Sequence, residues 1–124
     1  MVKIRAFTLI ELIVVLAIVA LLLTLAMPRY FQSIDTSKQA VLKENLHVLR
    51  STIDKFYADK GRYPESLEEL VDLKYLRAVP LDPITEQRKT WVVVAPDGDL
   101  KGRVFDVKSG ALGNAVDGKP FAEW

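Results

Sequence analysis

The sequence predicts an α+β fold in which one long amino-terminal helix is packed against a small carboxyl-terminal domain with a short helix and a small antiparallel sheet. Three observations predict this fold. An uninterrupted apolar run extends from Leu12 to Leu23, an amphipathic helical pattern resumes after Pro28, and a strand–turn–strand pattern follows residue 90. The 124 residues leave room for a membrane segment and one small domain.

Residues 7–27 form the apolar half of the predicted helix. At about 1.5 Å per residue this half is about 32 Å long, close to the roughly 30 Å hydrocarbon core of a bilayer. Lys3 and Arg5 precede it, so the positive-inside rule places the amino end in the cytoplasm and the remaining domain outside. A secretory signal peptide, cleaved near residues 24–26, is the alternative interpretation. A signal peptide, however, gives no reason for Glu11 inside the apolar segment.

The hexapeptide at residues 6–11, Ala-Phe-Thr-Leu-Ile-Glu, is followed directly by the apolar helix. Together they resemble the class III signal of type IV pilins and type II secretion pseudopilins, in which a prepilin peptidase cuts before the Phe and methylates the new amine. The resemblance implies cleavage between Ala6 and Phe7, N-methylation of Phe7, and a helix-bending role for Pro28. The family usually has glycine before the cut, where this chain has Ala6.

Glu11 is an acid within a membrane segment, which is costly and is therefore interpreted as functional. If cleaved helices pack side by side with an axial stagger, Glu11 of one subunit can meet the Phe7 amine of another. This pairing would fix the register of assembly and offset a desolvation cost of several kcal/mol per buried ion. The alternative is that Glu11 stabilises its own helix terminus, where the macrodipole favours an anion by about 0.3–1 kcal/mol.

The helical pattern continues beyond Pro28, which is expected to kink or locally melt the helix near residues 23–27. Gly61 and Pro64 then end the pattern, so one helix is predicted from about Phe7 to Lys60. Two helices hinged at Pro28 are the alternative. The apolar positions recur at steps of three and four residues and form one stripe: Leu42, Leu46, Leu49, Ile53, Phe56 and Tyr57.

The small domain is predicted over residues 61–124. Ser66 and Glu69 form a capping box for a short helix over residues 67–73, whose buried side is formed by Leu67, Leu70 and Val71.

Residues 90–95 and 103–108 are predicted to pair as antiparallel strands across a turn at residues 96–99. A two-stranded hairpin is marginal alone and needs the apolar stripe beneath it, with Trp91 or Trp124 at the seam.

A second group of residues extends the resemblance to most of the chain. Arg62-Tyr63-Pro64, the short leucine-rich helix, Tyr75-Leu76, the segment 80–83 and Trp91 resemble the major, G-type pseudopilin of type II secretion. Type IV pilins commonly close their carboxyl region with a disulfide, and this chain has no cysteine, which favours the pseudopilin branch. The implied organisation is a leader (residues 1–6), a transmembrane and assembly helix (7–27), an amphipathic helix half (28–60) and a globular pseudopilin domain (61–124).

Composition and motifs predict a structural subunit rather than an enzyme. A net charge of +1 argues against a nucleic-acid partner. The absence of cysteine excludes thiol catalysis, and a lone histidine, His47, is expected to be a surface or boundary residue. No cofactor is predicted. Calcium remains open without assigned ligands, because the available acids lie in turns that favour aspartate for local reasons: Asp97, Asp99, Asp106 and Asp117.

The predicted function is that of a structural subunit of a periplasmic pseudopilus in a type II protein secretion system. The expected partners are further copies of the chain, minor pseudopilins, the inner-membrane assembly platform, prepilin peptidase, and membrane lipid before assembly. The chain is expected to cross the inner membrane once, with its carboxyl-terminal domain in the periplasm, and then to enter a filament. The alternatives are a type IV pilus or DNA-uptake pilin, and a monomeric membrane-anchored or secreted binding module.

Overall fold

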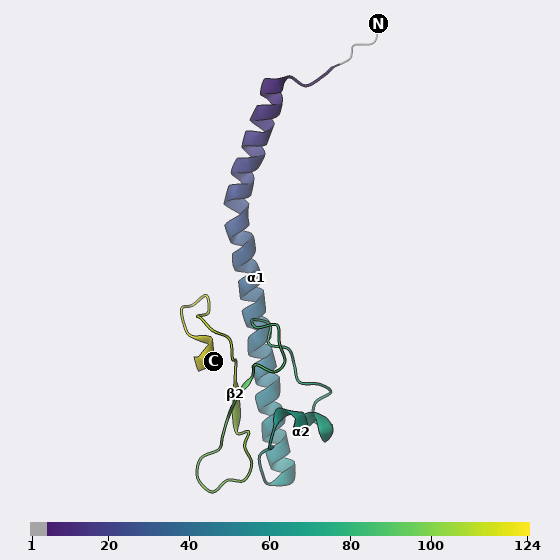
Figure 1. Cartoon of the computed structure of the whole chain (residues 1–124), viewed down its shortest axis with the longest axis vertical. Helices are drawn as coiled ribbons and strands as arrows, with labels where there is room; N and C mark the ends of the chain where they lie inside the picture. The colour runs from purple at the N-terminus through teal and green to yellow at the C-terminus, as the bar shows by residue number, and fades with distance from the viewer. Residues whose placement is uncertain (1–4) are drawn as a thin grey trace. The chain divides into compact units, whose positions relative to one another are not determined.

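The computed structural model describes residues 5–124, and it confirms the α+β class. Its elements are helix α1 (Leu9–Lys60), helix α2 (Leu67–Asp72), strands β1 (Val92–Val94) and β2 (Asp106–Lys108), and the 3-10 helix η1 (Phe121–Glu123) (Figure 1). The chain divides into two compact units, Met1–Asp35 and Thr36–Trp124, and α1 contributes residues to both.

The first unit contains the apolar half of α1. Its large hydrophobic side chains are exposed throughout, from 46% at Val19 to 84% at Phe7. By length and composition α1 is able to cross a membrane, with a mean hydropathy of 3.0 in its apolar window; a signal sequence near the amino terminus would pass the same test.

The helix continues through Pro28 without a break, so the predicted local melting near residues 23–27 is wrong. Proline has no N–H to bond to the carbonyl oxygen of Thr24, but the residues on both sides of it are helical. One helix rather than two hinged helices is therefore present, and a kink at Pro28 stays a prediction.

The second unit is built around the predicted apolar stripe of α1. Five of its six residues are 0–2% exposed: Leu42, Leu46, Leu49, Ile53 and Phe56. Tyr57 differs, because it lies on the flank of the stripe beside Phe56 and is 37% exposed, with its ring stacked on Tyr63 at 4.5 Å between centroids. The stripe packs against side chains from α2, the sheet and the carboxyl-terminal segment, which complete one core: Tyr63, Leu67, Leu70, Trp91, Val104, Val107, Ala111, Ala115 and Phe121.

The two strands pair antiparallel, as predicted, with Val93 opposite Val107. Both are shorter than the predicted spans. The second strand begins late because the N–H groups of Arg103 and Val104 donate to the carbonyl oxygen of Pro64 (3.0 and 2.9 Å) instead of to β1. Beyond the sheet, Gly110 lies so close to the main chain of Thr90 that a Cβ would overlap its carbonyl oxygen.

Trp91, one of the two tryptophans predicted at the seam between the hairpin and the apolar stripe, directly precedes β1 and belongs to the core. It is buried, and its indole N–H donates to the carbonyl oxygen of Pro80 at 2.8 Å. This bond satisfies the one polar atom of the side chain and fixes the segment that leads into β1.

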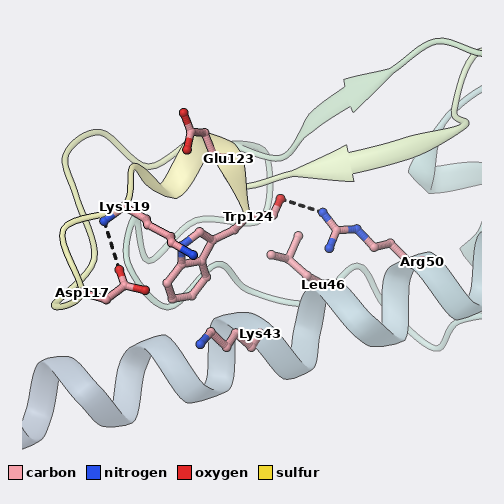
Figure 2. A pocket seen from close by; sticks show the side chains of 7 residues that line it. All are labelled: Lys43, Leu46, Arg50, Asp117, Lys119, Glu123 and Trp124. Atoms are coloured by element: carbon pink, nitrogen blue, oxygen red, sulfur yellow. Dashed lines mark hydrogen bonds between the residues drawn. The ribbon is translucent and has the colours of Figure 1, made fainter.

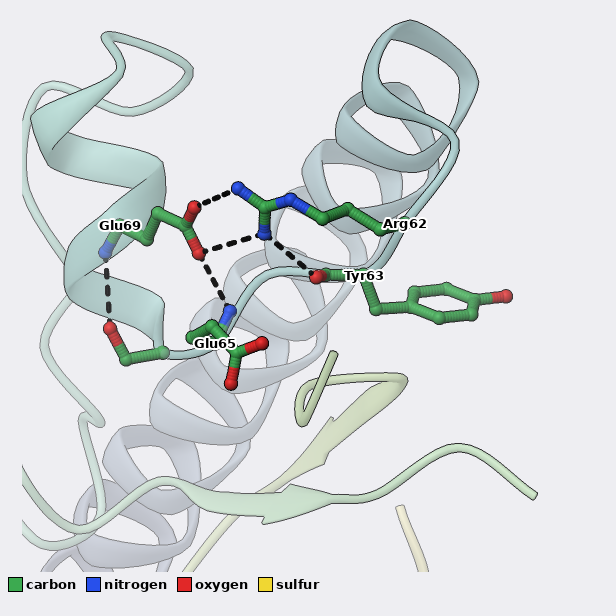
Figure 3. A network of polar contacts seen from close by, with 5 residues as sticks. Arg62, Tyr63, Glu65 and Glu69 are labelled. Atoms are coloured by element: carbon green, nitrogen blue, oxygen red, sulfur yellow. Dashed lines mark hydrogen bonds and ion pairs between the residues drawn. The ribbon is translucent and has the colours of Figure 1, made fainter. Parts of the chain in front are cut away.

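The predicted capping box of α2 forms in part. The Ser66 hydroxyl accepts the Glu69 N–H at 3.2 Å, as expected. The Glu69 carboxylate, however, accepts the N–H of Glu65 (2.7 Å) and two guanidinium hydrogen bonds of Arg62 rather than returning to Ser66 (Figure 3). The helix ends at Asp72, one residue before the predicted end, and Val71 is half-buried.

Candidate processing and assembly site

Helix α1 begins at a side-chain cap provided by Thr8. The carbonyl oxygen of Thr8 accepts the first helical hydrogen bond, from the N–H of Leu12 at 3.1 Å, and its hydroxyl oxygen accepts the N–H of Glu11 at 3.2 Å. Those two bonds define an N-cap residue. Residues 5–8 therefore precede the helix and are not helical.

The predicted cleavage site lies in this non-helical stretch. Ala6 and Phe7 are both exposed, and Phe7 is 84% accessible to solvent. Exposed, irregular backbone is the preferred substrate of proteases. The residues at this bond, together with Arg5 and Glu11, border one open hollow at the start of α1, so the structure brings Ala6, Phe7 and Glu11 to a common place.

The Glu11 carboxylate lies in the first turn of α1. Within residues 5–124 it forms no ion pair. Its backbone N–H, by contrast, is satisfied by Thr8. An acid whose carboxylate is uncommitted is available to accept a cation from outside the described part of the chain. Lys3 and the other residues of positions 1–4 lie outside it.

Thr8 was not singled out by the sequence analysis. The signal that could have identified it is the spacing Thr-x-x-Glu over residues 8–11, which is the pattern of a capping box. This pattern is difficult to recognise because Leu9 and Ile10 belong to the apolar segment. Glu11 was interpreted as a functional acid rather than as part of a cap.

Pro28, the fourth predicted site residue, lies inside α1. One turn before it, the Thr24 hydroxyl donates to the carbonyl oxygen of Ala20 at 2.8 Å. Such a back-bond satisfies a hydroxyl that would otherwise face an apolar environment. Thr24 can therefore enter a bilayer with α1.

In the second unit, Arg50 of α1 clasps the carboxyl-terminal segment. Its guanidinium pairs with the Asp106 carboxylate at 2.9 Å and donates to the main-chain oxygens of Val107 (3.0 Å) and Trp124 (2.7 Å). A hollow of about 330 Å³ lies beside this clasp. Figure 2 shows its lining residues, which besides Arg50 and Trp124 are Lys43, Leu46, Asp117, Lys119 and Glu123. The ammonium of Lys43 lies 4.8 Å from the centroid of a Trp124 ring, a cation–π contact.

Arg62 and Glu69 form a second clasp, between the end of α1 and α2 (Figure 3). Hydrogen bonding from Arg62 lowers the pKa of the Glu69 carboxyl group, while burial opposes it to a lesser extent; the same bond raises the pKa of Arg62. Nearby, the Tyr75 hydroxyl donates to Asp59 at 2.9 Å, which raises the pKa of that tyrosine. The Arg62–Glu69 and Tyr75–Asp59 contacts join α1 and the turn after it to α2 and the segment that follows α2.

Asp82 is a buried acid that the sequence analysis did not single out. Its carboxylate is 0% exposed and accepts the Ser109 hydroxyl at 2.6 Å and the N–H groups of Ile84 (2.8 Å) and Thr85 (3.3 Å). The signal is present in the sequence as an aspartate before a proline-led turn, a common position for this bonding pattern. The partner Ser109 lies 27 residues away and is not predictable from local sequence.

The four acids considered for calcium do not gather. Asp106 is engaged by Arg50, and Asp117 accepts the N–H of Lys119 at 3.0 Å within its own turn. Across residues 5–124 no group of three or more histidine or acidic residues is placed to hold a metal ion. Calcium needs six to eight oxygen ligands, so these residues do not fit it. His47 is exposed on α1, as predicted.

Comparison with known proteins identifies the first segment. Residues 1–27 match the model of the prokaryotic N-terminal methylation motif, which covers about a fifth of the chain. Over 66 residues, or 53% of its length, the chain is 38% identical to the type IV major pilin protein PilA of Myxococcus xanthus strain DK1622. The matched segment spans 30% of that pilin. No solved structure matches the chain.

Proposed function

We propose that this chain is a type IV pilin-like structural subunit, cleaved by a prepilin peptidase between Ala6 and Phe7 and polymerised through the apolar half of α1. The observation that carries the proposal is an apolar helix whose side chains find no cover within their own unit and whose first turn carries a single acid, Glu11, inside the segment that matches the methylation motif. A large exposed apolar surface marks a site that a membrane or a partner covers.

Cleavage before Phe7 creates a cationic amine in the segment that leads into α1. Glu11 lies four positions further, in the first turn of α1. Two helices packed side by side with an axial stagger bring the amine of one chain to the carboxylate of the next. The apolar surfaces alone would slide past one another, so we assign this ion pair the task of fixing the register.

Before assembly, lipid covers the same surface. Arg5, ahead of the apolar segment, holds the amino end in the cytoplasm, and the second unit lies in the periplasm. Entry into the filament then replaces helix–lipid contacts by helix–helix contacts. Neither state requires the chain to catalyse a reaction.

The filament that we propose first is the pseudopilus of a type II secretion system, with minor pseudopilins and the inner-membrane platform as partners. The cysteine-free carboxyl region and the motifs at residues 62–64, 75–76 and 80–83 support it. A type IV pilus is the second candidate, favoured by the similarity to a type IV major pilin. Deleting the secretin and assembly proteins of each machine in turn, and measuring which deletion abolishes the filament, distinguishes the two.

Replacement of the acid tests the proposal. In Glu11→Ala the chain should insert into the membrane at the normal level but yield filaments reduced by at least tenfold, because the amine loses its partner. The matched control is Glu44→Ala, an exposed acid further along α1, which should assemble normally. Normal filament yield from Glu11→Ala would refute the registry role.

Mass spectrometry of the mature amino terminus separates the classes of function. A methylated Phe7 is expected for the pilin-like subunit. An intact Met1 would indicate a membrane-anchored module, and a start near Met27 would indicate a secreted domain.

A further inference from the structure

We infer that Thr8 is a positioning residue for the peptidase: its hydroxyl starts α1 immediately beyond the Ala6–Phe7 bond and so keeps that bond out of the helix. The inference rests on the proposed processing of the chain. The inference adds one residue, Thr8, to that processing. Thr8 neither touches the broken bond nor takes part in the subunit pairing assigned to Glu11.

The first support is the geometry of the cap. Thr8 uses its carbonyl oxygen for the Leu12 N–H and its hydroxyl for the Glu11 N–H, at 3.1 and 3.2 Å. The helix begins at Leu9, and the bond between Ala6 and Phe7 therefore lies two residues before it. The cap places the bond close to the rigid helix and yet outside it.

The second support is that local sequence alone would not stop the helix there. Arg5 and Ala6 are strong helix formers, and none of residues 5–7 is a glycine or a proline. These residues are nevertheless non-helical and exposed. Among residues 5–8, Thr8 is the one whose side chain makes a helix-starting hydrogen bond.

The third support comes from the chemistry of hydrolysis. Water adds across the Ala6–Phe7 amide, the C–N bond breaks, Ala6 leaves with a carboxylate, and Phe7 keeps the nitrogen as an ammonium group. In a helix the amide N–H and carbonyl are hydrogen-bonded within the helix and side chains surround the backbone, so this approach is blocked. A bond held in irregular, exposed backbone presents its carbonyl to the enzyme.

The cap also leaves the acid free. A complete capping box would use the Glu11 carboxylate to accept the Thr8 N–H. In this structure no such hydrogen bond forms, and the hydroxyl of Thr8 alone caps the turn. The carboxylate is thus available for the amine that the cleavage creates.

The test uses the full-length precursor in membranes with purified prepilin peptidase, and measures the rate of release of residues 1–6. Thr8→Val has nearly the same shape but no acceptor, and a lost cap is expected to slow cleavage about fivefold, because the helix extends across the bond in most molecules. Thr8→Ser and Thr8→Asn, which both cap helices well, should be cleaved at close to the wild-type rate. Amide NMR of the precursors in micelles should place Ala6 and Phe7 in the helix only for Thr8→Val.

Three outcomes overturn the inference. Cleavage of Thr8→Val at the wild-type rate would show that the cap does not matter. Equal slowing in Thr8→Val and Thr8→Asn would show that the enzyme reads the hydroxyl directly. In both cases the wild-type chain is still cut and the proposed function stands, whereas a wild-type precursor that is never cut removes the processing itself.

Discussion

The two halves of α1 bury their apolar side chains in different ways. In the second unit the stripe from Leu42 to Phe56 is covered by the chain's own short helix, sheet and carboxyl-terminal segment, and it is almost inaccessible. In the first unit apolar residues of similar size, such as Leu16 and Leu22, are each 59% exposed. One continuous helix thus has a core of its own along one half and none along the other.

The difference follows from the pattern of the sequence. The second half is apolar on one face and charged on the others, which suits a helix that packs against a domain. The first half is apolar around its whole circumference, which suits a lipid or multi-helix environment. The chain itself buries the apolar face of the second half. The apolar side chains of the first half can be buried only by molecules outside the chain.

The sharpest way to break this comparison is to truncate one leucine in each half. Leu49→Ala should lower the free energy of unfolding of the second unit by about 2–5 kcal/mol, because it leaves a cavity in the core. Leu16→Ala should change it by less than about 0.5 kcal/mol. Urea unfolding in micelles, followed by tryptophan fluorescence, measures this unit alone because both tryptophans, Trp91 and Trp124, belong to it. Equal losses would mean that the halves are not energetically distinct.

A smaller effect is expected at the clasp between α1 and the carboxyl-terminal segment. Arg50→Met removes the pair with Asp106 and two hydrogen bonds to main-chain oxygens. We expect a loss of about 2 kcal/mol, since charge-assisted hydrogen bonds contribute about 1.5–3 kcal/mol and this side chain is partly solvated. Lys55→Met, an exposed cation on the same helix, is the matched control and should leave the urea midpoint unchanged.

The smallest effect is expected at α2 and depends on pH. Arg62 lowers the pKa of Glu69, so the folded state favours the ionised carboxylate. The resulting stability is present above the ordinary pKa of 4.5 and is lost as the pH falls below it toward the lower folded pKa. Glu69→Gln should cost about 1 kcal/mol at pH 7 and progressively less below pH 4.5. Thermal melts of this variant and of Glu68→Gln, an exposed neighbour, at several pH values would test it; a constant difference would contradict the assignment.

Periodicity was sufficient to predict most of the fold. The spacing of Leu42, Leu46 and Leu49 determines which face of α1 is buried, and Gly61 gives the end of the helix. The strand lengths were predicted less well, because Arg103 and Val104 bond to Pro64, and a contact across that sequence distance leaves no local signal. For the same reason the partners of Arg50 and the distant partner of Asp82, Ser109, could not be predicted.

The candidate site also contains residues that were predicted from the sequence and one that was not. Ala6, Phe7 and Glu11 form a contiguous motif, so their proximity along the chain is predictable, and the structure brings them to one hollow. The role of each stays a prediction. Thr8 was missed although the Thr-x-x-Glu spacing of residues 8–11 is present in the sequence, and the two hydrogen bonds of its cap are seen in the first turn of α1.

The buried contact between Asp82 and Ser109 joins two distant loops without sulfur chemistry. A carboxylate and a hydroxyl at 2.6 Å need no oxidant to form their bond and no reductant can break it. Because the sequence contains no cysteine, the fold of the carboxyl-terminal region does not depend on thiol oxidation.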